Sequence, residues 1–222
     1  MEHIVIDGGS DDGTLPILKA RQADLAVLVS EPDAGVYDGL NKGIARATGD
    51  IVGLLHADDV FAGPEVLSRV AAAFEDPAVD AVYGDLEYVA RDDLSRVIRH
   101  WSAGEYDSSR LRWGWMPPHP TLYLRRSLYE RFGGFDTRYR IAADYDLMLR
   151  MLTRMEGKVV YIPEVLVRMR LGGISNRSLR SIARKSREDY QAIRANRIGG
   201  PGTLVSKNLR KLPQFWQRQR TR

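Results

Sequence analysis

Two adjacent carboxylates, Asp58 and Asp59, follow an apolar run over residues 51–55. Such a run is typical of a fully buried strand, and ligands of open α/β sheets bind beyond the carboxyl ends of the strands. Paired carboxylates at that position suit Mg²⁺ or Mn²⁺, which completes its coordination shell with water and substrate phosphate. A turn, or the cap of a helix that begins at Pro64, would also suit two aspartates, so the pair alone leaves both interpretations open.

A third carboxylate, Asp144, lies where the spacing of apolar residues predicts the start of a helix over 142–155. The helix dipole favours an anion in the first turn, so we expect Asp144 to be ionised at neutral pH. By itself the position is explained more simply by an ordinary N-cap. Asp146 is two residues further on and faces another side of the helix, which argues against a paired acid and base. The methionines Met148, Met151 and Met155 are most simply core residues.

Hydrophobic periodicity predicts the elements that must position these carboxylates. Alternating strands and helices in the first half of the chain imply a parallel, doubly wound sheet. The second half is less regular and includes a probable loop around three tryptophans. Strands are predicted at residues 3–6, 25–29, 51–55, 79–83, 122–124, 159–162 and 165–169, and helices at 14–20, 36–47, 64–74, 127–132 and 142–155.

Length and composition limit the class of protein. A chain of 222 residues with 44% hydrophobic content can form one domain with a sizeable core and a modest appendage. The absence of cysteine excludes disulfides and thiolate metal sites. No apolar run approaches the roughly 20 residues that span a bilayer, and the first residues lack the basic region and apolar core of a signal peptide.

Charge is distributed unevenly along the chain. Residues 177–222 carry 13 Lys and Arg against two acidic side chains, whereas residues 1–176 carry 20 basic and 27 acidic ones. A helix over 178–196 and a break at 199–202 are followed by apolar and aromatic residues that alternate with basic ones, namely Leu204, Leu209, Leu212, Phe215 and Trp216. This pattern suits an anionic membrane surface, and a solvated helical face with a frayed terminus explains it equally well. Nucleic acid is not expected as a partner, because no recognisable nucleic-acid module is present.

Five segments together resemble the family 2 glycosyltransferases with a GT-A fold, especially those of bacterial polysaccharide and glycolipid synthesis. They appear in the family's order and lie within residues 3–176. Any one of them is a weak signal, but five in order are specific. The segments are VIDGGSDDGT (5–14), DAGVYDGLNKGIARATGDIVGLLHADD (33–59), VYGD (82–85), PHPTLYLRRSLYERFGGFD (118–136) and AADYDLMLR (142–150).

The resemblance implies a fold and a division of the chain. It implies an α/β, Rossmann-like GT-A domain over residues 1–176, with a mixed, mostly parallel sheet flanked by helices. Residues 177–222 would then form a basic amphipathic tail.

The resemblance also implies an activity. It points to a metal-dependent, inverting, hexosyltransferase-type enzyme that uses Mg²⁺ or Mn²⁺. The donor would be a nucleotide-diphospho-sugar, and the acceptor a hydroxyl of a glycan or lipid-linked molecule in cell-surface polysaccharide or glycolipid synthesis. We expect a cytoplasmic enzyme, with the tail able to hold it on the inner face of the cytoplasmic membrane.

The matching motifs carry roles onto particular residues. Asp59 resembles the direct metal ligand, and Asp58 lies closer to the ribose or to a metal-bound water. Asp144 matches the carboxylate that acts as general base on the acceptor hydroxyl. A metal that bridges the two donor phosphates would neutralise the charge of the departing nucleoside diphosphate.

Other matches concern the donor. Asp7 begins the turn that approaches the nucleotide base. Asn41 and Gly43 match the Asn-x-Gly of the helix packed near the donor.

Three further side chains are weaker candidates. His119 would contact metal, diphosphate or acceptor, although a lone histidine between prolines is more often structural. Asp85 would support the acceptor side, although an aspartate at a strand end is commonly a turn residue. His56 could act on the same metal, but strand alternation points it elsewhere.

The chain departs from the family pattern at three places. Gly8 stands where relatives often carry the aspartate that reads the nucleotide base, and Ala143 stands where many carry glutamate. The family's first strand and the helix after it are missing, so we expect that the recorded start is too late or that the chain is a truncated fragment. That strand normally lies inside the sheet, and its absence would leave apolar surface and backbone groups without partners.

Two other functional classes stay open at this level. One is a non-catalytic sugar-nucleotide or glycan-binding relative that lost turnover together with its first strand. The other is a metal-dependent nucleotidyltransferase, which would normally need a Gly-rich basic loop for the triphosphate. No such loop is visible near the N-terminus.

Overall fold

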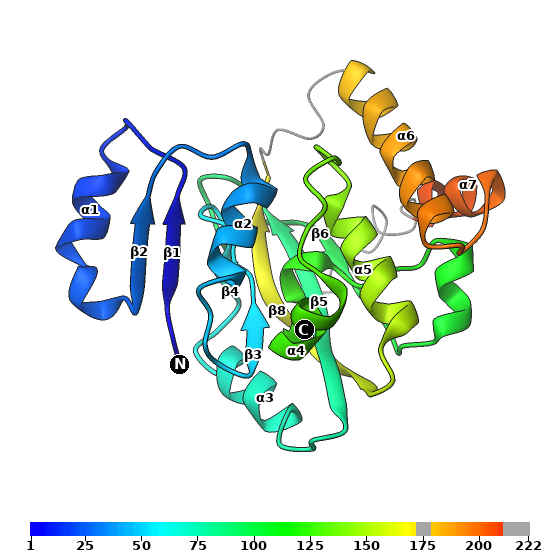
Figure 1. The fold of residues 1–222 in the computed structure, drawn as a ribbon, viewed down its shortest axis with the longest axis horizontal. Helices are drawn as coiled ribbons and strands as arrows, with labels where there is room; N and C mark the ends of the chain where they lie inside the picture. The colour runs from blue at the N-terminus through cyan, green and yellow to red at the C-terminus, as the bar shows by residue number, and fades with distance from the viewer. Residues whose placement is uncertain (172–178, 211–222) are drawn as a thin grey trace.

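The computed structural model describes residues 1–171 and 179–210, in which the predicted alternation of strands and helices largely forms (Figure 1). The strands are β1 (Ile4–Asp7), β2 (Val27–Ser30), β3 (Ile51–Gly53), β4 (Val60–Phe61), β5 (Val79–Val89), β6 (Val97–Trp101), β7 (Tyr123–Arg125) and β8 (Lys158–Arg170). The helices are α1 (Thr14–Ala20), α2 (Val36–Ile44), α3 (Val66–Ala73), α4 (Arg126–Phe132), α5 (Ala143–Arg154), α6 (Leu179–Ala195) and α7 (Pro201–Leu209). Short 3-10 turns are η1 (Gln22–Asp24), η2 (Ser108–Trp113) and η3 (His119–Thr121).

The strands form a mixed sheet, as expected for the GT-A fold, but most neighbours run antiparallel. The larger sheet has the order β3-β7-β5-β8-β4, with β6 also paired to β5. Among the described residues only β1–β2 and β5–β8 are parallel, and the other four pairings are antiparallel. The expectation of a mostly parallel sheet was therefore wrong. Parallel neighbours need long crossovers, whereas β5 and β6 are joined by a short hairpin.

Strands β1 and β2 form a separate sheet of their own. Within the described residues β1 pairs only with β2, and β3 pairs only with β7, so one edge of each strand has no strand partner. Helix α2 packs against β1, because a Cβ at Gly43 would lie 3.4 Å from Ile6 Cγ1. This close approach fixes the helix that carries Tyr37 and Asn41.

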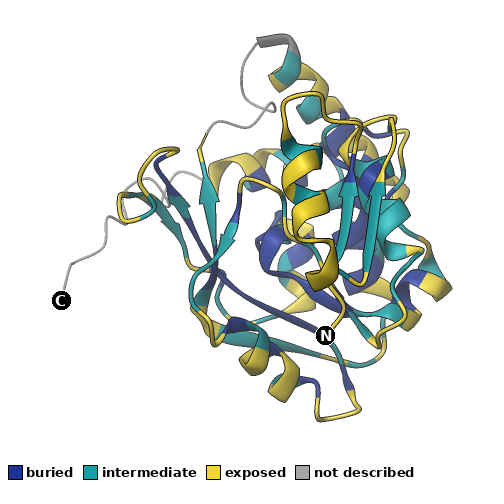
Figure 2. Ribbon diagram, turned by 90° about the vertical axis from the view of Figure 1, so that its left-hand side faces the viewer, coloured by how far each residue is buried: buried dark blue, intermediate teal, exposed yellow. Residues whose placement is uncertain are grey.

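The core lies on both faces of β5, which is buried along most of its length (Figure 2). On one face the strand packs against α5, whose Met148 and Met151 are 1% and 0% exposed, so the prediction that these two methionines are core residues is confirmed. Met155, just after the helix, is only partly buried against the same core. Full burial of each such side chain stabilises the fold by about 1.5–3 kcal/mol. Helix α5 is thus held rigidly along its length, which matters because Asp144 lies in its first turn.

Two predicted strands have different limits in the structure. Strand β3 ends at Gly53, which is exposed, so the expected buried strand over 51–55 is shorter and the chain leaves the sheet before His56. The strands predicted at 159–162 and 165–169 are one strand, β8, which continues through Pro163. The β5–β8 register shifts at this point, between Gly84 and Asp85, and the irregularity accommodates a residue that has no N–H to donate.

The basic C-terminal region forms α6 and α7, which pack against α5 and η2. Ala192 and Ile193 are fully buried, and Lys207 forms a buried ion pair of 2.6 Å with Asp189. Lys207 is therefore not available to a membrane surface. Leu212, Phe215 and Trp216 of the predicted basic segment lie outside the described residues. No helix in the described ranges is long and apolar enough to cross a bilayer.

Candidate active site

Asp144 lies in the first turn of α5, two residues after the N-cap residue Ala142. Ala142 has no side-chain oxygen with which to cap the helix, and it adopts a non-helical backbone conformation. The Asp144 side chain is 19% exposed. A carboxylate at this position benefits from the positive end of the helix dipole and still reaches solvent or a substrate.

Two side chains from distant parts of the sequence contact the Asp144 carboxylate. The Tyr37 hydroxyl of α2 lies 3.3 Å from Asp144 Oδ1 and donates a 2.8 Å hydrogen bond to the Ile141 carbonyl. His119 Nδ1 of η3 lies 3.3 Å from Asp144 Oδ2. Burial raises the pKa of Tyr37, so its hydroxyl keeps its proton and acts as a donor. Asp144 is thereby oriented from both sides.

His119 in turn contacts His56, which precedes the aspartate pair. The two Nε2 atoms lie 3.4 Å apart, and the rings meet edge to face with centroids 5.6 Å apart. Burial lowers the pKa of both histidines, so both are neutral at pH 7. The contacts are satisfied when His119 carries its proton on Nδ1 and His56 carries its proton on Nε2. The alternation argument does not apply to His56, because β3 ends at Gly53 before it, and a role at the metal stays a prediction.

The two aspartates that follow β3 have different environments. Asp58 is exposed, and its carbonyl accepts a 2.7 Å hydrogen bond from Arg170 Nη1. Asp59 is 5% exposed, and neither carboxylate oxygen has a hydrogen-bond partner. Burial raises the pKa of Asp59 to about 7, the nearby Asp58 charge acts in the same direction, and Arg170 opposes both. A buried carboxylate without partners is costly unless a cation completes it.

These surroundings fit a divalent metal at the aspartate pair. Asp59 offers two unpartnered hard oxygens, and the exposed Asp58 offers more. In the described part of the chain, no group of three or more His, Asp or Glu side chains is arranged to hold a metal ion. The ion would therefore take its remaining ligands from water and a phosphate-bearing ligand, as Mg²⁺ and Mn²⁺ commonly do.

The aspartate pair and Asp144 lie in one neighbourhood. The charges of Asp58 and Asp144 both act on His56, although burial has the larger effect on its pKa. Burial also raises the pKa of Tyr88 on β5, and the charges of Asp59 and Asp144 both add to that rise. The folded chain thus brings the predicted metal ligands and the predicted base within electrostatic reach of the same two side chains, His56 and Tyr88.

Asn41 and Gly43, which match the motif of the helix packed near the donor, have structural roles in this fold. The Asn41 side chain donates from Nδ2 to the Phe135 carbonyl and accepts from the Phe135 amide, both at 2.8 Å. Its polar atoms are thereby engaged with the loop that leads to α5. Gly43 permits the close approach of α2 to Ile6. The motif thus locks α2 to its neighbours, and the nearness of this helix to a donor stays a prediction.

Asp7 and Asp85 are also engaged within the fold. The Asp7 carboxylate accepts from the Ser10 amide at 3.1 Å and the Ser30 hydroxyl at 2.6 Å, and hydrogen bonds from Ser10 and then Ser30 lower its pKa. Asp7 thus closes the turn, and whether that turn reaches a nucleotide base stays a prediction.

Asp85 is equally occupied. Its Oδ1 accepts from the Ala103 amide and the Tyr161 hydroxyl, at 2.8 and 2.7 Å. Its Oδ2 lies 3.6 Å from His100 Nε2. These contacts engage both carboxylate oxygens within the fold, and a role of Asp85 on the acceptor side stays a prediction.

The position of Gly8 is explained by a neighbouring carboxylate. A Cβ at Gly8 would lie 2.6 Å from Asp33 Oδ2, so a side chain there would displace Asp33. Asp33 also accepts a 2.8 Å hydrogen bond from the Gly35 amide at the start of α2. The Asp33 carboxylate thus occupies the space beside Gly8, where relatives often carry an aspartate at position 8 itself.

Replacing Asn41 by Ala tests its structural role. Because two backbone groups of Phe135 lose their partners, we expect the free energy of unfolding to fall by about 2–3 kcal/mol, with unchanged affinity for a nucleotide-sugar donor per folded molecule. Chemical denaturation and donor titration measure the two quantities. A loss of donor affinity without a loss of stability would show that Asn41 contacts the donor and does not act through the Phe135 backbone.

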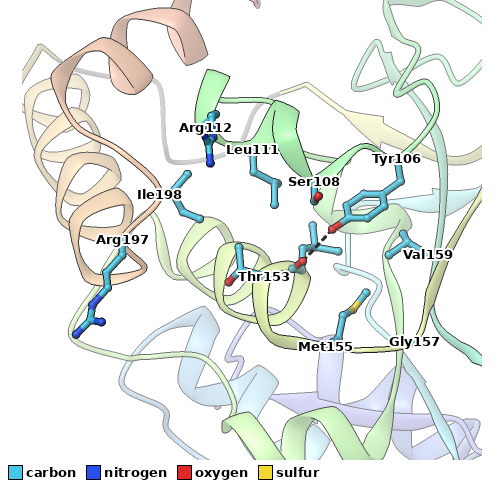
Figure 3. A pocket seen from close by; sticks show the side chains of 11 residues that line it. Tyr106, Ser108, Leu111, Arg112, Thr153, Met155, Gly157, Val159, Arg197 and Ile198 are labelled. Atoms are coloured by element: carbon cyan, nitrogen blue, oxygen red, sulfur yellow. Dashed lines mark hydrogen bonds between the residues drawn. The ribbon is translucent and has the colours of Figure 1, made fainter.

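A pocket of about 410 Å³ lies away from this group of residues (Figure 3). It is formed between η2, the C-terminal part of α5 and the link from α6 to α7. Its lining includes Tyr106, Leu111, Arg112, Thr153 and Ile198, and none of the predicted site residues. Volume alone therefore does not locate the chemistry, which follows the aspartates and histidines.

Tyr37 is a site residue that sequence patterns did not identify. It belongs to the matched segment 33–59, but a tyrosine on a short amphipathic helix is ordinarily a core residue. It meets Asp144 across a separation of 107 positions in the chain. No local pattern reports such a contact.

Comparison with known proteins agrees with this geometry. The family model described as "Glycosyl transferase family 2" matches residues 1–145 of the 222. The chain belongs to glycosyltransferase family 2. This glycosyltransferase is 35% identical over 158 residues to an uncharacterized glycosyltransferase of Mycobacterium tuberculosis, a match that covers 68% of the chain and 56% of the relative. It is 32% identical over 180 residues to a PGL/p-HBAD biosynthesis glycosyltransferase of Mycobacterium bovis, covering 79% of the chain and 68% of the relative.

Solved structures support the GT-A fold of this family 2 glycosyltransferase. Staphylococcus aureus TarS, in complex with UDP-GlcNAc, superposes with a TM-score of 0.65 at 17% identity, over 88% of this chain and 56% of TarS. The mannosyltransferase PcManGT of Pyrobaculum calidifontis, in complex with GDP-Man and Mn²⁺, superposes with a TM-score of 0.60 at 25% identity, over 97% of this chain and 64% of PcManGT. The chain thus spans 56% and 64% of the length of these two solved chains and 56% of the first relative.

Proposed function

We propose that this glycosyltransferase moves a sugar from a nucleotide-diphospho-sugar to an acceptor hydroxyl with inversion and with the help of a divalent metal. The observation that carries the proposal is the contact chain from Asp144 through His119 to His56. It joins the general-base candidate to the loop that bears Asp58 and Asp59. A base and a phosphate-binding metal site within one neighbourhood are what a single displacement at an anomeric carbon requires.

In this proposal Asp144 accepts the proton of the acceptor hydroxyl. The acceptor oxygen bonds to the anomeric carbon while the bond from that carbon to the phosphate oxygen breaks, which inverts the configuration. His119 and Tyr37 hold the carboxylate in place and stay neutral. Asp59 and Asp58 would hold Mg²⁺ or Mn²⁺, which supplies charge neutralisation to the departing nucleoside diphosphate.

Relatives support the proposed donor class. TarS has been solved with UDP-GlcNAc, and PcManGT with GDP-Man and Mn²⁺. The direct test is release of UDP or GDP from a panel of UDP- and GDP-sugars, with and without Mn²⁺, followed by NMR of the anomeric configuration in the product. Metal-dependent release with inverted product supports the proposal. Specific binding without turnover would favour the non-catalytic alternative.

We propose a lipid-linked acceptor and peripheral attachment to the inner face of the cytoplasmic membrane. The PGL/p-HBAD relative is named for a biosynthetic pathway, and the tail region is basic. Trp113, Val205 and Leu209 are each 58% exposed. Trp113 lies beside α7, because its carbonyl accepts hydrogen bonds from Ser206 Oγ at 2.7 Å and Arg210 Nε at 3.1 Å. Exposed apolar side chains beside arginine suit an anionic lipid interface.

Trp113→Ser combined with Leu209→Ser tests this surface. Because each side chain would lose its burial in lipid, we expect binding to phosphatidylglycerol-containing vesicles to weaken about 10- to 100-fold in a sedimentation assay. Ile17→Ser on α1 is the matched control, since Ile17 is an apolar side chain that is 68% exposed and lies on an element other than η2 and α7. Equal binding of the double variant and the wild type would remove the membrane proposal. Deleting residues 200–222 is a poorer test, because Thr203 and Lys207 are buried.

A further inference from the structure

Helix α6 contributes a buried carboxylate to the segment that leads into Asp144. Glu188 is 7% exposed, and its Oε2 accepts hydrogen bonds from the Ile141 amide at 2.8 Å and the Ala142 amide at 3.1 Å. These are the residues just before α5, whose N-cap Ala142 offers no side-chain oxygen. The carboxylate that caps this end of the helix therefore comes from a residue more than 40 positions away in the sequence.

The Ile141 peptide is held from two sides. Glu188 accepts from its amide, and the Tyr37 hydroxyl donates to its carbonyl while also reaching Asp144. The three residues from Ile141 to Ala143 thus have little freedom, and Asp144 follows at once. A second contact fastens the end of α6 to α5, because Asn196, directly after α6, donates from Nδ2 to Asp146 Oδ1 at 2.8 Å.

We infer that Glu188 is a positioning residue for Asp144, so that α6, from the basic C-terminal region, completes the active site. The inference rests on the proposed function, since it assigns Glu188 a role only if Asp144 is the base. The loss of two buried hydrogen bonds explains why a change at Glu188 should affect Asp144. Two N–H groups that lose a buried acceptor will shift toward another partner, and a shift of about 1 Å in a base costs about 100-fold in rate.

Three variants separate positioning from general stability. Glu188→Leu removes the acceptor, and Glu188→Gln keeps a carbonyl oxygen that can accept both amides. Thr203→Val is the matched control, because Thr203 is 6% exposed and its Oγ1 donates to the Arg112 carbonyl, away from α5. All three are made in the full chain, alongside Asp144→Asn, and their thermal midpoints are recorded.

We expect Glu188→Leu to lower kcat about 10- to 100-fold with donor KM changed by less than about 2-fold, and Glu188→Gln to restore kcat to within about 3-fold of wild type. Thr203→Val should lower the thermal midpoint and leave kcat unchanged. Unchanged kcat in Glu188→Leu, or an equal loss in Thr203→Val at the same stability, would overturn the inference.

Hydrogen exchange distinguishes failure of this inference from failure of the proposed function. The amides of residues 141 and 142, resolved by NMR, should exchange faster in Glu188→Leu but not in Thr203→Val. If Asp144→Asn keeps full activity, the assignment of the base is wrong, whatever Glu188 does. If Asp144→Asn is inactive while those amides and kcat are unaffected in Glu188→Leu, the positioning role alone is wrong.

Discussion

The Asp144→Asn variant is expected to lose about 10²- to 10⁴-fold in kcat while keeping its affinity for the nucleotide-sugar donor. Asparagine has nearly the shape of aspartate, and its side-chain carbonyl can still accept from Tyr37 or His119, so the geometry at the start of α5 should persist. It cannot accept a proton at neutral pH, so the attacking hydroxyl loses its base. Nucleoside diphosphate release in the presence of acceptor measures the loss.

Asp146 provides the control for this experiment. It is 5% exposed, two residues further along the same helix, and its oxygens are engaged by Arg150 at 3.1 Å and Asn196 at 2.8 Å. Asp146→Asn should therefore lower thermal stability and leave kcat nearly unchanged. A loss of less than about 3-fold in Asp144→Asn would show that another group takes the proton, and the proposed mechanism would have to be abandoned.

The Asp59→Asn variant is expected to lose metal-dependent activity and, without metal, to be more stable than the wild type at pH 8. Asp59 has a pKa of about 7 in the folded protein, raised by burial, against about 4 in an unfolded chain. Between these values the folded state holds a proton that the unfolded state has released. Stability of the metal-free protein therefore falls as pH rises through about 4 to 7, and stays low above that range.

Neutralising the side chain removes this penalty, so Asp59→Asn should gain about 1–3 kcal/mol at pH 8 and much less at pH 5. Metal binding removes the same penalty in the wild type, so Mn²⁺ should raise the thermal midpoint more at pH 8 than at pH 6. Asp58→Asn is the comparison: Asp58 is exposed and its charge is a smaller cause of the raised Asp59 pKa than burial, so its loss should weaken the Mn²⁺ response and stabilise the metal-free protein less than Asp59→Asn does. An undiminished Mn²⁺ response in Asp59→Asn would exclude Asp59 as a ligand.

Much of the architecture was predictable because it depends on local patterns. The apolar spacing of α5 and α2, the alternation of the first strands and helices, and the five ordered segments were sufficient for the GT-A fold and family 2. Strand direction was not predictable in the same way. The position of β7 beside β5 and its antiparallel direction depend on how the chain returns across the sheet. The three residues of β7 contain no pattern that predicts this direction.

The candidate site also combines features that local sequence motifs predicted with features that depend on tertiary contacts. The sequence by itself determined the family, and it proposed Asp58, Asp59 and Asp144 as the reactive carboxylates, because those motifs are contiguous in the chain. Only the tertiary structure decided that His56 meets His119, that Asn41 serves the Phe135 backbone, and that Tyr37 and Glu188 converge on the residues before α5. Each of those contacts joins segments 46 to 104 positions apart, and a side chain's partner across such a distance is set by packing, which no local pattern encodes.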